Sequence, residues 1–192
     1  MPSRWLYTGL VLLVGVERLV ELALSRRHAR RAFEKGGIEV GRAHFRWMAL
    51  LHVGLLAACV AEVWLLGRRF VPELAAPMLA LTLLAQGLRY WVIATLGWRW
   101  NVRVIVVPGE PVVTTGPYRF MRHPNYLAVI VEGIALPLVH GAYLAATAFT
   151  LLDAWVLRAR IRIEERALAE HCDYDRRFGD KPRLGLASGS RT

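Results

Sequence analysis

Polar side chains that could do chemistry stand in two short stretches of an otherwise apolar chain. The first is TTGPYRFMRHPNY, residues 114–126, and the second is RIRIEERAL, residues 160–168. The first stretch combines a histidine, an asparagine and two tyrosines with prolines that free backbone groups from helical pairing. The second places Arg160 four residues before Glu164, on one face of a helix. Such groups could bind a polar small molecule and hold an anion.

Each stretch also has a purely structural interpretation. RHPNY, at residues 122–126, could anchor a helix at the headgroup level of a membrane, with a proline in its first turn. Arg160 and Glu164 could form an ordinary ion pair on a solvated helix. Because both stretches are predicted to lie on one side of the membrane, we weigh a shared binding site against these interpretations.

The sequence lacks the common motifs of nucleotide-binding, serine-nucleophile and metal sites. It contains neither GxGxxG nor GxxxxGK[ST], no serine in a nucleophile elbow and no metal-ligand spacing. The two cysteines, Cys59 and Cys172, provide no disulfide framework. An enzyme built on this chain would need an unusual cofactor site at the membrane edge, and it would need no metal.

Composition predicts an all-α integral membrane protein. The chain has 192 residues, of which 55% are hydrophobic. Apolar stretches near 3–25, 47–67 and 71–96 are each long enough to cross the membrane, which takes about 20 residues. The first stretch is charged and lacks a small-residue cleavage site, so we expect it to remain in the mature chain.

A further apolar run, residues 126–157, is too long for one crossing. Pro137 and Gly141 lie near its middle and favour a turn, so we predict a short helical hairpin. With the three earlier spans this makes about five transmembrane helices. The charged segment after Leu157 is predicted to continue into the cytoplasm as a C-terminal helix.

We predict a single domain over residues 1–192. Its parts are three spans (1–96), then a loop, the hairpin and the cytoplasmic helix (97–178), and a disordered polar tail (179–192). In the loop, VRVIVV at 102–107 favours extended backbone, and PGEP and TTGPY favour turns.

The net charge is +10, and its distribution favours lipid over nucleic acid as a partner. Twenty of the 25 Lys and Arg residues fall in three segments, 26–46, 97–124 and 158–192. These segments can share one side of the membrane, which the positive-inside tendency makes the cytoplasmic side. Arg68 and Arg69 count against this orientation. Anionic headgroups account for the basic excess.

Charged residues inside the spans have a packing role in our interpretation. Glu17, Arg18 and Glu21, with Glu62 and Arg89 on the next two spans, are predicted to form a buried ionic network, because an unpaired charge is costly at membrane depth. Tryptophans near the end of the third span are predicted to be interface anchors, and they stand at positions 91, 98 and 100.

The motifs VVTTGPYRFMRHPNY and RIRIEERAL, separated by a hairpin, resemble the isoprenylcysteine carboxyl methyltransferase family of membrane methyltransferases. ERLVELALSRRHARR, GGIEVGRAHF and LRYWVIATLGWRWN are similar to its bacterial branch associated with type III polyketide synthases, whose members O-methylate alkylpyrones or alkylresorcinols. Membrane sterol reductases that use NADPH carry an element similar to RHPxY. The added GPY and RxxxEE favour the methyltransferases.

The resemblance implies an S-adenosylmethionine site on the cytoplasmic side and a lipophilic acceptor that enters from the bilayer. It places Arg160 near the acceptor as the candidate catalytic residue. The implied cofactor-binding residues are Val112, Val113, Tyr118, His123, Pro124, Asn125, Tyr126 and Glu164. The family continues with FGxxYxxY, where this chain has AEHCDYDRRF, with Tyr174 and Phe178 as loose substitutes.

The leading hypothesis is therefore an S-adenosylmethionine-dependent O-methyltransferase of a lipophilic acceptor, either an alkylpyrone or alkylresorcinol or a prenylcysteine carboxylate. The alternatives are an NADPH-dependent membrane reductase and a non-catalytic membrane scaffold. Arginine far outnumbers lysine, which favours a GC-rich bacterial genome and hence a bacterial plasma membrane.

Overall fold

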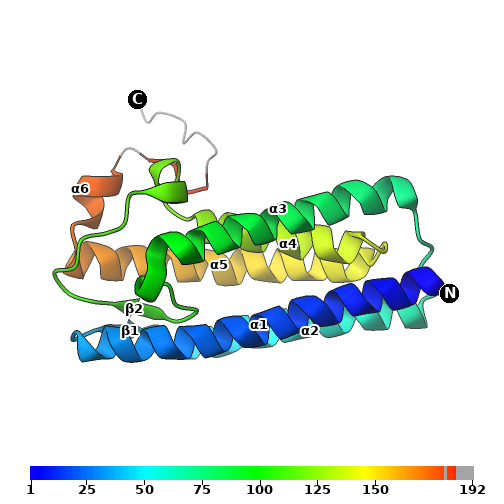
Figure 1. Cartoon of the computed structure of the whole chain (residues 1–192), viewed down its shortest axis with the longest axis horizontal. Coiled ribbons are helices and arrows are strands. Elements are labelled where there is room, and N and C mark those ends of the chain that lie inside the picture. Colours follow the sequence, from blue (N-terminus) through cyan, green and yellow to red (C-terminus); the bar gives the residue numbers. More distant parts are fainter. Residues whose placement is uncertain (180, 185–192) are drawn as a thin grey trace.

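The computed structural model describes residues 1–179 and 181–184 of the chain, and long helices lying side by side dominate it (Figure 1). The elements in chain order are α1 (Pro2–Glu34), β1 (Ile38–Val40), α2 (Arg42–Leu65), α3 (Pro72–Leu96), β2 (Val104–Val106), α4 (Pro124–Leu138), α5 (Tyr143–His171) and α6 (Tyr174–Phe178). Short 3-10 turns at Gly97–Arg99 and Gly116–Arg119 lie in the connection between α3 and α4.

The helices enclose an apolar core and also present apolar side chains outward. α3 packs against α4, and α5 packs against both α2 and α4. The core includes the buried side chains of Tyr7, Val63 and Phe149. On the outside, Leu84 is 69% exposed and Leu151 is 70% exposed. Apolar residues on both the inner and the outer faces are what a helix bundle in lipid requires.

In the part of the chain that the structure describes, two helical segments are long and apolar enough to cross a membrane, His44–Leu65 and Pro72–Arg99. α1 extends well past its predicted span, and charged residues lie near its centre. α4 is apolar, but its length of about 22 Å falls short of a hydrocarbon core of about 30 Å. The helical architecture is confirmed apart from the short strands β1 and β2, whereas the count of five spans stays a prediction.

The chain reverses between α4 and α5, within the predicted hairpin. The turn covers residues 139–142, and Gly141 adopts φ of 65°, a conformation that favours glycine. The two arms pack closely, because a Cβ atom on Gly133 would collide with the ring of Phe149. α5 then continues without a break to His171, so one helix forms both the second arm and the predicted cytoplasmic segment.

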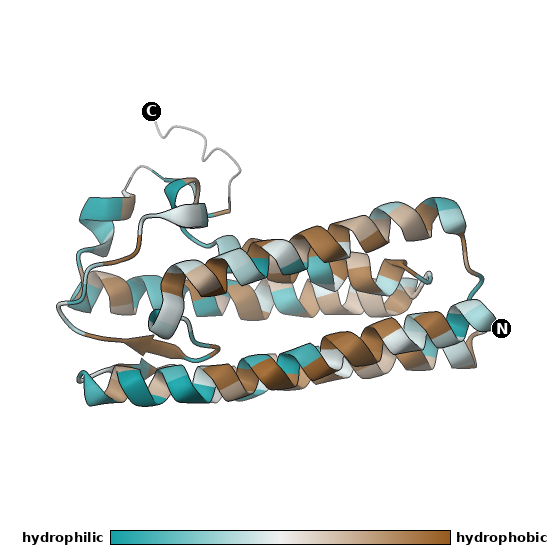
Figure 2. Cartoon of the chain, in the orientation of Figure 1, coloured by the Kyte–Doolittle hydropathy of each residue, from teal (hydrophilic) through white to brown (hydrophobic). Residues whose placement is uncertain are grey.

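A small sheet fastens the polar end of the bundle. β1 and β2 are antiparallel, with Ile38 opposite Val106 and Val40 opposite Val104. The predicted extended segment is thereby confirmed at β2, whereas its partner β1 was not predicted. Figure 2 shows that hydrophilic residues gather in the C-terminal part of α1 and in α6, at the same end of the molecule. Because β1 follows α1 and β2 lies between α3 and α4, the sheet joins the turn after α1 to the loop that follows α3.

The buried ionic network forms, but with one member different from the prediction. Arg89 pairs with Glu132 of α4, and Arg18 lies 2.8 Å from Glu21 and 3.6 Å from Glu132. Glu62 instead accepts hydrogen bonds from backbone amides at the start of α5 and pairs with Arg68. The first amides of a helix have no partners within the helix, so they attract this carboxylate.

Candidate functional site

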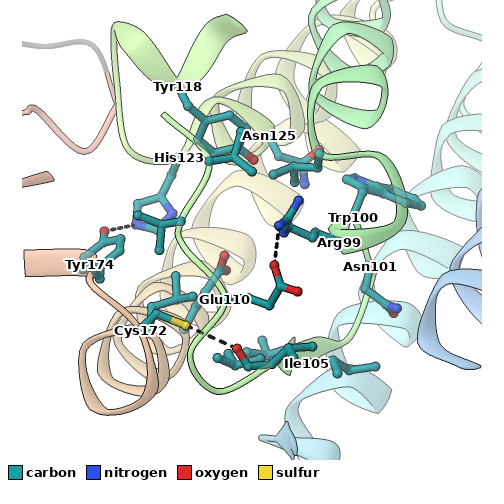
Figure 3. Close-up of a pocket in the computed structure, with 18 of the residues that line it drawn as sticks. Arg99, Trp100, Asn101, Ile105, Glu110, Tyr118, His123, Asn125, Cys172 and Tyr174 are labelled. Atoms are coloured by element: carbon teal, nitrogen blue, oxygen red, sulfur yellow. Dashed lines mark hydrogen bonds and ion pairs between the residues drawn. The ribbon is translucent and has the colours of Figure 1, made fainter. Parts of the chain in front are cut away.

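A cavity lies at the polar end of the bundle, between the α3–α4 loop, the end of α5 and α6 (Figure 3). It encloses about 1130 Å³ of empty space, part of it open to solvent. The space in which the centre of a water molecule can sit is about 150 Å³, so the cavity is a concave candidate site for a small molecule.

The structure brings together eight of the nine residues predicted for the site. The residues that line the cavity are Val112, Val113, Tyr118, His123, Asn125, Tyr126, Arg160 and Glu164. Pro124 is the exception, because it is buried as the first residue of α4, where a proline suits the start of a helix. The two sequence stretches thus face one cavity, while the role of each residue stays a prediction.

Arg160, Tyr126 and Glu164 form a chain of hydrogen bonds. Arg160 Nε donates to the Tyr126 hydroxyl at 2.9 Å, and that hydroxyl donates to Glu164. Tyr126 is held by packing against Leu157 and Ile161, which lie on the same side of α5 as Arg160 and Glu164. The spacing of residues along α5 therefore determines which side chains reach the cavity.

Arg160 is a buried cation with no direct carboxylate contact among the residues that the structure describes. Its exposed fraction is 5%. Within residues 1–179 and 181–184, no carboxylate oxygen lies within 4.0 Å of its guanidinium nitrogens. A buried charge is costly unless it is paired, and Arg160 lines the cavity. This arrangement is suited to an anionic ligand.

His123 is held in place by groups from three parts of the chain. Its ring stacks on Tyr126 with centroids 5.2 Å apart, and its Nε2 lies 3.1 Å from Glu165. Tyr174 and Arg183 also donate to Glu165. Burial favours a raised pKa for Glu165, but the hydrogen bonds from His123 and Arg183 outweigh it and lower the pKa to about 2. Glu165 is therefore ionised at neutral pH.

The segment at Val112 and Val113 is positioned by Asp173. The Val112 amide donates to Asp173 at 3.1 Å, and this bond, followed by one from Arg177, lowers the pKa of Asp173 to about 2. Nearby, burial raises the pKa of Tyr118, so its hydroxyl remains a donor at neutral pH. The loop before the GPY turn is thus fixed to the short link between α5 and α6.

Trp100 was predicted to be an interface anchor, and this prediction is wrong. It is 3% exposed and lines the cavity, and its carbonyl lies 2.8 Å from His28 Nδ1 on α1. Arg99 and Glu110, an ion pair in the same wall, were not predicted either (Figure 3). Gly97, which ends α3, starts the 3-10 turn that carries Arg99 and leads into Trp100, and the glycine followed by WRWN is the sequence signal for it.

The tail contacts the site through Lys181–Leu184, so the prediction of disorder does not hold there. Arg122 and His123 donate backbone hydrogen bonds to Pro182 and Arg183, each at 3.0 Å. Leu184 packs against the Tyr126 cluster. The remaining tail positions, 180 and 185–192, lie outside the described residues. Tyr174 and Phe178, the loose substitutes for the family pattern, are buried and line the cavity.

Comparison with known proteins identifies relatives across most of the chain. YpbQ of Bacillus subtilis (strain 168), an uncharacterized protein, is 35% identical over 162 residues, which cover 84% of this chain and 96% of YpbQ. An uncharacterized protein of Haemophilus influenzae is 28% identical over 153 residues, with 79% and 88% covered. The nickel-cobalt-cadmium resistance protein NccN of Alcaligenes xylosoxydans xylosoxydans is 31% identical over 118 residues, with 57% and 54% covered.

A family model also matches residues 78–170, from α3 to the end of α5. This segment contains all nine residues predicted for the site and the Glu165 that holds His123. The matching model is the one described as the isoprenylcysteine carboxyl methyltransferase (ICMT) family. Together with the predicted motifs and the coverage of the relatives, this match shows that the chain belongs to the isoprenylcysteine carboxyl methyltransferase family.

Proposed function

We propose that this chain is an integral-membrane O-methyltransferase that uses S-adenosylmethionine to methylate a lipophilic acceptor. The family points to a methyltransferase, and the apolar helices indicate a membrane protein. One observation carries the proposal: buried Arg160, with no carboxylate partner in the described chain, lines the same cavity as Glu164. An anionic acceptor beside a polar cofactor would give both groups a partner.

The polar groups of the cavity fit S-adenosylmethionine. Trp100 Nε1 and Asn125 Oδ1 are buried and have no hydrogen-bond partner in the described part of the chain. The cofactor has hydroxyl and amino donors for Asn125 and Glu164, and it has acceptors for Trp100. We propose that these residues bind it together with Tyr118, His123, Tyr126 and the segment at Val112 and Val113, while Pro124 fixes the start of α4.

When bound, S-adenosylmethionine supplies a methyl carbon activated by a positively charged sulfur. In the proposed reaction an acceptor oxygen would form a bond to this carbon while the carbon–sulfur bond breaks, which would leave S-adenosylhomocysteine. Opposite charges are neutralised in this displacement, so the protein contributes mainly alignment and exclusion of water. Arg160, held through Nε by Tyr126, would hold the acceptor oxygen with its other nitrogens.

A buried arginine favours an acceptor that is an anion or readily becomes one. A carboxylate is ionised at neutral pH, whereas a simple phenol with a pKa of about 10 needs a nearby cation to lose its proton. Arg160 supplies such a cation. We propose alkylpyrones or alkylresorcinols as the first candidates, in keeping with the polyketide-synthase-associated branch, and a prenylcysteine carboxylate as the second.

We also propose that the cavity faces the cytoplasm of a bacterium. Exposed arginines lie on α1 near this end of the molecule, at positions 26, 27, 30 and 31. Anionic lipid and the positive-inside tendency would hold these residues at the inner face of the plasma membrane. The cofactor is made in the cytoplasm, so this orientation gives it direct access to the site.

Calorimetry on the purified protein in lipid nanodiscs tests the proposal. S-adenosylhomocysteine should bind with micromolar affinity, and labelled methyl groups should pass from S-adenosylmethionine to an alkylpyrone, an alkylresorcinol or a prenylcysteine. Binding of NADPH without binding of S-adenosylhomocysteine would identify a reductase instead. Absence of binding for either cofactor would favour a scaffold.

A further inference from the structure

The second carboxylate of the glutamate pair faces different partners from the first. Glu164 lines the cavity, whereas Glu165 stands outside its lining in the described chain. Glu165 is bound by Arg183 through two nitrogens, at 2.9 Å and 2.6 Å, and by the Tyr174 hydroxyl at 3.2 Å. Its remaining close partner is His123 Nε2, at 3.1 Å. Glu165 thus links the tail to the histidine of the cavity wall.

These contacts determine where His123 carries its proton. An ionised carboxylate only accepts hydrogen bonds, so the His123 nitrogen that faces Glu165 must be a donor. In a neutral imidazole the other nitrogen, Nδ1, is then an acceptor. In the neutral ring, the contact with Glu165 therefore favours a single tautomer, with the proton on Nε2.

The backbone places Arg183 for this role. The amide of His123 donates to the Arg183 carbonyl, and the amide of Arg122 donates to the Pro182 carbonyl. Arg122 Nε also donates to the Lys181 carbonyl at 2.6 Å. The histidine and the arginine that acts on it through Glu165 are thus joined twice, once by backbone and once by side chains. Bidentate pairing of an arginine with a carboxylate adds geometric precision to such a link.

We propose that Glu165 and Arg183 are positioning residues, which keep the proton of His123 on Nε2 so that Nδ1 accepts a hydrogen bond from a donor group of the cofactor. The inference rests on the proposed function for the identity of that cofactor, an adenosyl compound with amino and hydroxyl donors. His123 lines the cavity, and Nδ1 is the ring nitrogen that has no hydrogen bond to Glu165. Neither Glu165 nor Arg183 touches the cofactor in this arrangement.

Glu165→Gln is the informative variant, because it keeps the size of the side chain but can present an amide N–H to the imidazole. The tautomer then reverses, and Nδ1 becomes a donor. Loss of one hydrogen bond should weaken S-adenosylhomocysteine binding by about five- to tenfold. The KM for S-adenosylmethionine should rise, whereas kcat at saturating cofactor should change little. Arg183→Lys keeps the charge but not the bidentate geometry. Its affinity for S-adenosylhomocysteine should therefore lie between those of wild type and Glu165→Gln.

Nitrogen-15 NMR of histidine-labelled protein reads the tautomer without any cofactor, and a His123→Asn spectrum identifies the signal. At a pH at which the ring is neutral, wild type should carry the proton on Nε2, and Glu165→Gln should not. Arg176→Ala changes an exposed arginine whose ion pair and hydrogen bond in the described chain are with Asp173, and it should leave the tautomer and the affinity unchanged. This control separates the link from a general effect of charge at this end of the molecule.

Two results would overturn the inference. One is a wild-type ring with its proton on Nδ1. The other is a Glu165→Gln protein that binds S-adenosylhomocysteine normally but has a reduced kcat, which would make His123 a base for the acceptor. If the wild type bound no adenosyl compound, the proposed function would fail, while the NMR result would still decide the tautomer. A variant that unfolds is recognised by its melting temperature, and Arg183→Lys then serves in its place.

Discussion

Arg160 Nε donates a hydrogen bond to the hydroxyl of Tyr126, which itself donates a hydrogen bond to Glu164. Arginine and glutamate stand four residues apart, yet they do not form the direct ion pair that this spacing favours on an exposed helix. The Tyr126 hydroxyl lies between them instead. The cation is thereby kept in place through Nε, which leaves its other two nitrogens for a ligand.

We predict that Arg160→Ala lowers kcat/KM for methyl transfer by about a hundredfold, the effect of losing a charge-assisted contact worth about 2.7 kcal/mol. Binding of S-adenosylhomocysteine should remain within about twofold of wild type, because the acceptor and not the cofactor loses a partner. Kinetics with labelled cofactor and calorimetry measure the two quantities.

Arg158→Ala is the matched control for this change, since Arg158 is exposed on the same helix and should leave both quantities unaltered. If Arg160→Ala abolished cofactor binding to the same extent as activity, Arg160 would have to be assigned to the cofactor.

Sequence alone could identify the residues of the two motifs, but not the groups that complete the site. The motif residues are recognisable because polar side chains stand out next to apolar runs. Trp100 and Arg183 reach the same region only through the turn after α3 and the return of the tail. Neither path follows from local spacing, since both depend on how distant segments pack.

At the scale of the elements, the hairpin of α4 and α5 brings the two motifs together. Its arms come close at Gly133, where the ring of Phe149 occupies the space that a Cβ atom would need. This contact helps to determine how far α5 is rotated relative to α4, and hence which of its residues reach Tyr126. Small residues commonly allow such close approach between helices in membranes.

Gly133→Ala is expected to destabilise the protein by about 1–3 kcal/mol, because the added methyl group forces the Phe149 ring out of place. Gly87→Ala on α3, where nothing lies within 4 Å of the new Cβ, should not lower stability. Thermal unfolding in nanodiscs compares the two variants. A Gly133→Ala protein as stable as Gly87→Ala would show that the arms are not closely packed here.

Helices and turns were predictable because apolar periodicity, proline and glycine act locally. Pairings between elements were not predictable to the same extent. The network on α1 was expected to include Glu62, yet Glu132 takes that place, since the rotation of each helix decides which carboxylate faces Arg89. β1 was missed because three residues provide too little pattern to predict a partner so distant in the sequence.

At the scale of the whole molecule, one end is polar and holds the cavity, the sheet and the tail segment. The opposite end carries the α2–α3 connection and the turn of the hairpin, in agreement with Figure 1. This polarity matches the distribution of basic residues, apart from Arg4, Arg68 and Arg69 near the opposite end. Arg68 is paired with Glu62, which removes part of that objection to the proposed orientation.

Cysteine labelling in intact bacterial cells tests the orientation. In a chain with Cys59 and Cys172 replaced by alanine, a membrane-impermeant maleimide should label Arg69→Cys but not Arg30→Cys, because both positions are exposed at opposite ends of the molecule. Permeabilised cells should show labelling at both positions. The reverse pattern in intact cells would place the cavity outside the cytoplasm.

Because α5 is one unbroken helix, it also determines the depth of Arg160 relative to the lipid. Trp155, 74% exposed, precedes Arg160 by little more than one turn, and the exposed Arg158 and Arg162 stand on either side of it in the sequence. Such a change from aromatic to charged side chains marks the border between acyl chains and headgroups. An amphiphilic acceptor whose reactive oxygen lies at that border would therefore contact the guanidinium of Arg160 without leaving the bilayer. The length of its alkyl chain would then have little effect on whether it is methylated.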